Sequence, residues 1–344
     1  LGITKFQSIV ILCILITIIG SIYAIFGGLK AVAVSDTING VGLLIGGLMI
    51  PFLALNVLGH ASGSESSVAI MDGVRYLIHN HADMLNSIAP AQSEAPAVPW
   101  PTVFLGLVFL GFQSWCTHQS FIQRVLAAEN LKEAQKGALY CAFLKILGFM
   151  FLALPGVIAY AIFNIEGTQV SMMDDAYPAL ITRVVPQPVM GFFAAVMFGA
   201  ILSSFNSVLN SASTIFTLNV WQPIWGKQAS NNKVVKVGQI FGTVVGVVSI
   251  AIAPFVMFFG TGIMNFINEC WGFFSMPLLT AVLFGLLSKK APAIAPKVVI
   301  PVHIVLYGLT KVIPFFSRFH YLYVVFALFV LECIIYAICI KVCP

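Results

Sequence analysis

The stretch from Phe198 to Asn219 combines a long apolar run with many hydroxyl and amide side chains. In a bilayer each polar group needs a partner inside the protein. Residues spaced i, i+4, i+7 and i+11 share one helix face, and this spacing is followed by Ser203, Ser207, Asn210 and Thr214. The carbonyl of Ala200 lies one turn before the hydroxyls of Ser203 and Ser204, so three neutral oxygens can converge. Hard cations such as Na⁺ prefer such oxygens; the alternative interpretation is helix–helix packing through small polar residues.

The composition defines the class of protein that positions these residues. The chain has 344 residues, of which 60% are hydrophobic and 8% charged, with a mean hydropathy of +1.00. A soluble domain carries about 25% charged residues, so the sequence predicts an all-α polytopic membrane protein. The net charge of +5 is dispersed, which argues against nucleic acid as a partner. The seven cysteines form no CxxC pair, so neither a disulfide framework nor a zinc site is indicated.

The apolar runs predict about nine transmembrane helices in a single domain, 1–344, because a span needs roughly 20 apolar residues. The predicted spans are 7–29, 31–57, 101–123, 137–163, 189–221, 234–259, 262–287, 297–314 and 321–340. The first two are joined tightly at Gly27-Gly28-Leu29-Lys30. Prolines near span ends are expected to kink or break helices; they are Pro155, Pro254, Pro277 and Pro301.

Residues 59–99 form a polar insert, and its middle part, Ser66 to Ser87, is compatible with an amphipathic surface helix. His79 and His81 are two residues apart, so on a helix they point away from each other, which favours a solvated segment over a metal site. Lys and Arg gather in the loops after odd-numbered spans, and the positive-inside rule places those loops in the cytoplasm. The insert is then extracytoplasmic.

Ionisable side chains at membrane depth are candidates for function. Lys145 and Glu269 lie well inside their predicted spans, Asp36 lies near the start of the second and Glu332 lies in the last. The alternative for Lys145 is a structural ion pair, with Glu269 as a possible partner. His118, at the end of the third span, fits an interfacial histidine better than a proton relay.

Several segments together resemble the sodium/solute symporter family, in its order and over nearly the whole chain, with the bacterial sugar-type branch nearest. The segments are Tyr23–Asn39, Trp115–Arg124, Ala127–Leu139, Leu154–Ala159, Ala176–Leu180 and Ser203–Thr214. The resemblance implies a leucine-transporter-type inverted-repeat fold and, for the bacterial branch, a multi-pass protein of the cytoplasmic (inner) membrane of a bacterium. It also implies that the chain begins at the fourth core helix, as an N-terminally truncated member without the discontinuous first core helix. Residues 1–344 alone are therefore expected to show no measurable sodium binding, because two hydroxyls and one carbonyl are too few ligands.

The resemblance assigns the sodium site to Ala200, Ser203 and Ser204, and a possible second sodium to Asp36 and Ser207. Asn206 stands where members with a second ion usually have threonine. No metal site beyond sodium is expected.

The positions that match the substrate site are Trp115, Lys145 and Asn268, with Glu269 beside them. Trp115 can stack on an apolar ring face and Lys145 can donate to a hydroxyl or an anion. The family's usual glutamine is replaced by Asn268, its aromatic gate by Ser114 and a polar residue by Gly111. These departures separate the chain from ordinary glucose or galactose carriers.

The leading hypothesis is sodium-coupled symport of a small organic solute, a sugar or sugar derivative, by alternating access, with Na⁺ as coupling ion and solute and bilayer as partners. No obligate protein partner is evident. The alternatives are proton coupling through Glu269 or Asp36 and a non-transporting membrane sensor. An intramembrane enzyme is disfavoured, because the sequence holds neither a G-x-S-x-G nor an HExxH motif.

Overall fold

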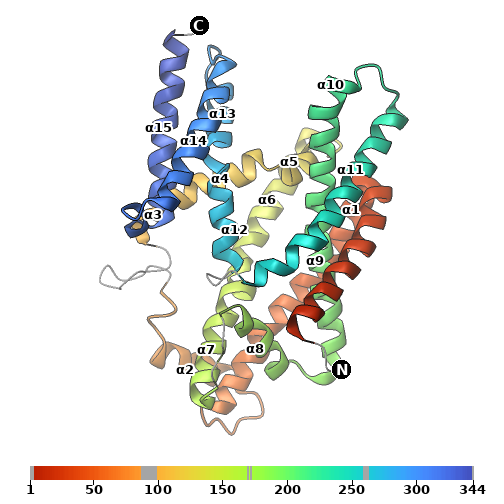
Figure 1. The fold of residues 1–344 in the computed structure, drawn as a ribbon. Helices are drawn as coiled ribbons and strands as arrows, with labels where there is room; N and C mark the ends of the chain where they lie inside the picture. Colours follow the sequence, from red (N-terminus) through yellow and green to blue (C-terminus); the bar gives the residue numbers. More distant parts are fainter. Residues whose placement is uncertain (1–3, 87–98, 169, 171–172, 259–262, 343–344) are drawn as a thin grey trace. The chain divides into compact units, whose positions relative to one another are not determined.

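The chain folds into helices throughout the parts that the structure describes. A computed structural model describes residues 4–86, 99–168, 170, 173–258 and 263–342, and the regular secondary structure within these ranges is helical (Figure 1). The helices form two compact units with separate apolar cores. Unit 1 comprises Leu1–Leu85 and Gln123–Gly262, and unit 2 comprises Asn86–Ile122 and Ile263–Pro344. The predicted all-α fold is confirmed.

Helix α1 (Lys5–Ala61) organises unit 1, and it consists of two arms joined at Gly28. Gly28 has φ 63°, in the left-handed region that favours glycine, and this break separates an arm of residues 5–27 from an arm of residues 29–61. The predicted tight join is therefore confirmed. The first arm packs on α11 (Asn231–Ile252), with the Phe6 ring 6.2 Å from that of Phe255 in the following 3-10 helix η5 (Ala253–Phe258).

The second arm of α1 runs antiparallel to α9 (Gln187–Ile215), the helix that carries the polar stripe. Asn39 donates to the carbonyl oxygen of Gly199 at 3.1 Å, and Gly46 lies against Phe193 further along. Residue numbers rise along α1 as they fall along α9. Glycines at the crossing let the two backbones approach closely, as is common between membrane helices.

The remaining helices of unit 1 complete its core. They are α2 (Ile70–Asn80), α6 (Leu131–Gly148), π-helix η2 (Phe149–Ala153), α7 (Leu154–Glu166), 3-10 helix η3 (Met173–Asp175), α8 (Ala176–Val184), π-helix η4 (Phe216–Trp221) and α10 (Gln222–Trp225). The helix predicted within Ser66–Ser87 is present as α2, which buries Gly73 and Leu77 against α1 and exposes its other face. Residues 87–98 of the insert lie outside the described residues.

Unit 2 contains the C-terminal helices and the segment around residue 110. Its helices are α3 (Trp100–Thr102), π-helix η1 (Val103–Leu107), α4 (Val108–Thr117), α12 (Ile263–Gly272), α13 (Ser275–Leu287), α14 (Ile294–Val312), 3-10 helix η6 (Phe316–Arg318) and α15 (Tyr321–Val342). Helix α5 (Gln119–Leu126) contains the boundary between the units. Met276, Tyr307 and Val325 are fully buried in the core of unit 2.

Within the described residues, six helices are long and apolar enough to cross a membrane, and α12 with α13 makes a seventh if that pair, bent by 44°, is one span. The six are Gly27–Ala61, Leu131–Glu166, Gln187–Trp225, Asn231–Val256, Ile294–Val312 and Tyr321–Val342. The first predicted span corresponds to a shorter apolar helix, Phe6–Ile22, and the predicted span 101–123 is divided among α3, η1, α4 and α5. The total of about nine stays a prediction.

Candidate functional site

Asp36 forms the centre of a polar cluster between the second arm of α1 and the stripe of α9. The Ser203 hydroxyl donates to Asp36 Oδ1 at 2.5 Å, and the Ser207 hydroxyl lies 3.4 Å from Oδ2. The Ser207 hydroxyl also donates to the carbonyl oxygen of Ser203 at 2.7 Å, the better of its two contacts. The structure thus brings together three of the residues predicted for sodium binding, and the i, i+4 spacing of the two serines is the cause.

Arg124, which sequence reasoning treated as a loop charge, belongs to this cluster. Its Nη2 donates to the Asp36 carboxylate and to the Ser207 hydroxyl. Only 16% of the Asp36 side chain is exposed, so the guanidinium supplies the positive charge that a half-buried carboxylate requires. The signal for this role was the position of Arg124 directly after the apolar run that ends the third predicted span.

Ala200 and Ser204 lie on the same helix, with Ala200 about one turn before Ser203 and Ser204 directly after it. Ala200 lines an apolar cavity of about 830 Å³ between α9 and the second arm of α1. Ser204 is exposed, whereas Ser203 is half-buried beside Asp36. A hydroxyl has one proton to donate and two lone pairs, so Ser203 can bond Asp36 through its proton and still offer its oxygen to a cation.

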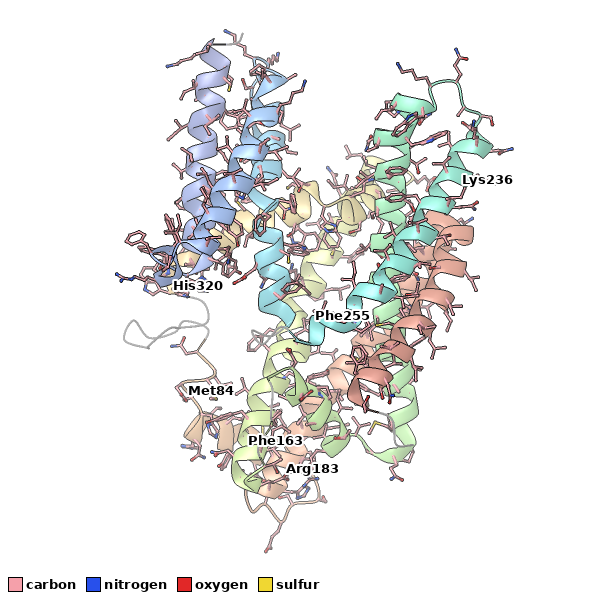
Figure 2. All side chains as sticks on the ribbon, viewed as in Figure 1. Met84, Phe163, Arg183, Lys236, Phe255 and His320 are labelled. Atoms are coloured by element: carbon pink, nitrogen blue, oxygen red, sulfur yellow. The ribbon has the colours of Figure 1, made fainter. Side chains whose placement is uncertain are left out.

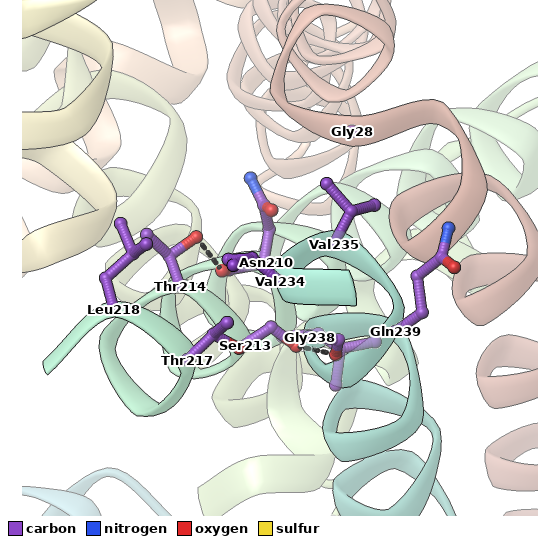
Figure 3. Close-up of a pocket in the computed structure, with 11 residues that line it drawn as sticks. Gly28, Asn210, Ser213, Thr214, Thr217, Leu218, Val234, Val235, Gly238 and Gln239 are labelled. Atoms are coloured by element: carbon purple, nitrogen blue, oxygen red, sulfur yellow. Dashed lines mark hydrogen bonds between the residues drawn. The ribbon is translucent and has the colours of Figure 1, made fainter. Parts of the chain in front are cut away.

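The lower half of the predicted stripe faces a different cavity, of about 240 Å³, beside the Gly28 break of α1 (Figure 3). There Thr214 donates to the carbonyl oxygen of Asn210 at 2.8 Å, and Ser213 donates to that of Gly238 on α11 at 3.0 Å (Figure 3). The stripe therefore divides in two. Ser203 and Ser207 contact Asp36, whereas Asn210 and Thr214, further along α9, line this second cavity.

Asn206 does not join the Asp36 cluster. Its side chain is fully buried on the α9 face that meets the first arm of α1, where Gly20 leaves room for it. Within the described part of the chain, neither of its amide atoms has a hydrogen-bond partner. At the position where threonine was expected, the chain therefore presents an amide to a neighbouring helix and not to Asp36.

The four residues predicted for substrate binding are distributed over both units. Lys145 is exposed on α6 in unit 1. Trp115 is on α4 in unit 2 and stacks on Phe121 at 4.8 Å, while Asn268 is half-buried on α12. Their joint role in solute binding stays a prediction.

Glu269 has a partner within its own unit. Lys311 Nζ lies 3.2 Å from Glu269 Oε1 and also lies over the Tyr307 ring at 5.2 Å. Both side chains are partly exposed, so the pair contributes about 1 kcal/mol or less. The ion-pair partner of Glu269 is therefore Lys311, whereas the sequence had suggested Lys145 as a possible partner.

Glu332 is part of a buried network that the sequence did not predict. It contacts His303 of α14 and Thr280 of α13, and each of the three residues is at most 1% exposed. The sequence analysis gave Glu332 no partner, because His303 lies 29 residues earlier in the chain, on a different helix, and sequence spacing does not show which helices pack together.

These features define a class: a multi-pass helical membrane protein with a polar, acid-containing site inside a helix pair. The chain matches the sodium:solute symporter family over residues 1–294, and it belongs to that family. The family consists of membrane transporters rather than enzymes and has bacterial members.

Two bacterial relatives illustrate the match. The chain is 38% identical over 337 residues to an uncharacterized symporter, YidK, of Escherichia coli (strain K12), covering 97% of this chain and 56% of the relative. It is 32% identical over 283 residues to the sodium/glucose cotransporter of Vibrio parahaemolyticus, covering 78% of this chain and 51% of the relative. The chain therefore spans about half the length of the curated relatives it matches.

A solved structure shows the same fold. A Na⁺-coupled sialic acid symporter in a substrate-bound outward-open state superposes with a TM-score of 0.79, at 20% identity, over 99% of this chain and 68% of that one. The fold assignment to the leucine-transporter type is confirmed by this likeness.

Proposed function

We propose that the protein is a sodium-coupled symporter for a small organic solute, of the sugar or sugar-derivative type, in the bacterial cytoplasmic membrane. Membership of the sodium:solute symporter family supports this proposal. So does the presence of sodium/glucose cotransporters among its relatives. The observation that carries the proposal is the Asp36–Ser203–Ser207 cluster, whose two serines lie on the stretch of α9 that also contains Ala200 and Ser204.

In this proposal Ala200, Ser203 and Ser204 provide oxygens to one Na⁺. The carbonyl of Ala200 and the two hydroxyls are neutral, so they replace water around the ion without adding charge to the membrane interior. Asp36 acts through Ser203: by accepting the hydroxyl proton, it orients the Ser203 lone pairs away from itself and towards the ion.

A second Na⁺ at Asp36 and Ser207 has a competitor in this chain. Arg124 contacts both side chains and already places a positive charge beside the carboxylate. A second cation there would meet like-charge repulsion unless the guanidinium moved. We therefore propose a single sodium ion, with Arg124 as a tethered counter-ion for Asp36.

Solute and ion are carried together by alternating access, in which one bundle of helices rocks against the rest. The driving force is the sodium gradient plus about 2.3 kcal/mol per charge per 100 mV of membrane potential. Lys145, Trp115, Asn268 and Glu269 are the proposed solute-contacting residues.

The proposal is tested with the full-length protein reconstituted in liposomes. An inward sodium gradient should drive accumulation of at least one radiolabelled sugar, amino sugar or sugar acid from a panel, and replacing sodium with choline should abolish it. A potassium-filled, sodium-free liposome with an inward proton gradient is the control. Accumulation that follows the proton gradient and ignores sodium would overturn the proposal.

A further inference from the structure

A buried acid–imidazole pair lies at the centre of unit 2, outside the proposed sodium site. His303 Nδ1 is 2.5 Å from Glu332 Oε1, and His303 Nε2 is 2.8 Å from the carbonyl oxygen of Gly272. Thr280 Oγ1 lies 2.5 Å from Glu332 Oε2 and 2.7 Å from the carbonyl oxygen of Met276, so its one hydroxyl proton is shared between two acceptors. Both members of the pair are about 1% exposed, so water does not screen them.

The contacts fix where protons must be. A backbone carbonyl oxygen only accepts, so His303 Nε2 carries a hydrogen and donates it to Gly272. The contact between Nδ1 and Oε1 then needs one more proton, carried by the histidine or by the glutamic acid, because two lone pairs 2.5 Å apart would repel. Whichever atom holds this proton, the pair as a whole binds it and is electrically neutral.

The pair is placed where it can act on the break between α12 and α13. Gly272 is the last residue of α12, and the two helices meet at a bend of 44°. Pro277 has no N–H to donate to the Phe273 carbonyl four residues earlier. The backbone bonds directly after α12 are turn bonds, from the N–H of Phe273 to Cys270 at 3.3 Å and from that of Phe274 to Trp271 at 3.1 Å. The hydrogen bond from His303 to Gly272, and that between Thr280 and Glu332, tie both sides of the bend to α14 and α15.

We propose that Glu332 and His303 form a proton-binding site whose single bound proton locks the α12–α13 bend. With the proton present, Nδ1 and Oε1 attract each other, and the imidazole is held with Nε2 towards Gly272. When the proton leaves, the pair has one negative charge and two opposed lone pairs in an apolar core, so it separates and the Gly272 carbonyl loses its donor. Opening of the bend releases one proton and is favoured as pH rises.

Few other charged groups face this site. Tyr307 stacks against His303, and Lys311, the ion-pair partner of Glu269, lies over the same Tyr307 ring. Cys333 and Tyr336 lie beside Glu332 on α15. The described segments η1, α4 and α13, which pack in the same core, contain no Asp, Glu, Lys, Arg or His.

Hydrogen–deuterium exchange of the full-length protein in detergent tests this inference. After correction for the pH dependence of intrinsic exchange, amides around residues 270–280 should lose protection above a threshold pH, by up to about tenfold per pH unit, because one proton is released. Glu332→Gln supplies a permanent N–H to His303 Nδ1 and still accepts from Thr280, so protection in that variant should be independent of pH.

Glu166→Gln is the control, because it neutralises a partly exposed carboxylate on α7 in unit 1, outside the core that holds the pair, and should keep the wild-type profile. A wild-type profile without pH dependence at the bend would overturn the inference, even if Glu332→Gln does not fold. The same pH dependence in Glu332→Gln as in the wild type would overturn it as well. The sodium-transport proposal is unaffected by either result.

Discussion

At the scale of single residues, Asp36 is the side chain whose environment most constrains the others. A carboxylate inside a helix pair is costly unless opposite charge and hydrogen bonds surround it. Asp36 receives the charge of Arg124 and the hydroxyl proton of Ser203. The hydrogen bond to Asp36 thereby fixes the orientation of the Ser203 hydroxyl and leaves its lone pairs available to an ion. A serine on an otherwise apolar helix face would have no such partner to orient its hydroxyl.

Ser204→Ala in the full-length protein should raise the sodium concentration for half-maximal uptake by about tenfold, equivalent to about 1.4 kcal/mol, because a site with few oxygens loses one. Ser211→Ala is the control further along α9, where the hydroxyl donates to the Ser207 carbonyl oxygen and should matter less. The measurement is the initial rate of uptake against sodium concentration. Equal sodium affinities in Ser204→Ala and wild type would remove Ser204 from the site.

Arg124→Gln should leave Asp36 without its counter-ion, lowering the free energy of unfolding by about 1–3 kcal/mol in sodium-free buffer. Sodium should restore part of this loss, because the ion can now pair with Asp36 and Ser207. Thermal unfolding in sodium and in choline measures both effects. The double variant Arg124→Gln, Asp36→Asn should regain stability without sodium and should lose the extra sodium effect, so that sodium stabilises it no more than it stabilises the wild type. A sodium effect in the double variant as large as in Arg124→Gln would show that the extra ion does not bind at Asp36.

Lys145→Ala should impair solute uptake while sodium still stabilises the protein against thermal unfolding, if Lys145 contacts solute and not the ion. Lys311→Ala is the comparison, since it removes a lysine that pairs with Glu269 at a partly exposed position. Uptake in Lys145→Ala that equals the wild type would take this residue out of the substrate site.

At the scale of helices, the sequence predicted most elements but only some of their partners. Hydrophobic length predicted the C-terminal helices, and the pair of glycines at 27 and 28 predicted the join of the two arms. The i, i+4 rule placed Ser203 and Ser207 on one face. Neither rule says which helix lies opposite, so the guanidinium of Arg124 and the His303–Glu332 pair could not be found from one sequence.

Gly199→Ala should destabilise the crossing of α1 and α9, because an added Cβ would lie 2.6 Å from Asn39 Oδ1. Overpacking of this kind costs about 1–3 kcal/mol. Gly191→Ala, on the same helix with no neighbouring atom within 4 Å, should be neutral or stabilise by up to about 1 kcal/mol. The thermal unfolding temperatures of the two variants provide the comparison, and equal values would contradict the close crossing.

At the scale of the whole molecule, the distribution of charge orients unit 1 in the membrane. Figure 2 shows Lys236 and Arg183 at opposite ends of this unit, on α11 and α8. Arg183 is engaged with Glu166, with Nη2 2.8 Å from Oε1. Most loop lysines and arginines of unit 1 belong to the side of Lys236, so the positive-inside rule predicts that this end is cytoplasmic and that the α2 end is outside.

Cysteine labelling in intact cells tests this orientation. Ser66→Cys lies in the exposed segment before α2, and Gln228→Cys lies in the exposed loop between α10 and α11. In a background without the native cysteines, a membrane-impermeant maleimide added to whole cells should label Ser66→Cys. It should label Gln228→Cys only after the membrane is permeabilised, because that loop is on the side rich in lysine. The reverse labelling pattern would show that the topology is opposite to the predicted one. The direction from the Asp36 cluster to each side of the membrane would then be reversed with respect to the sodium gradient.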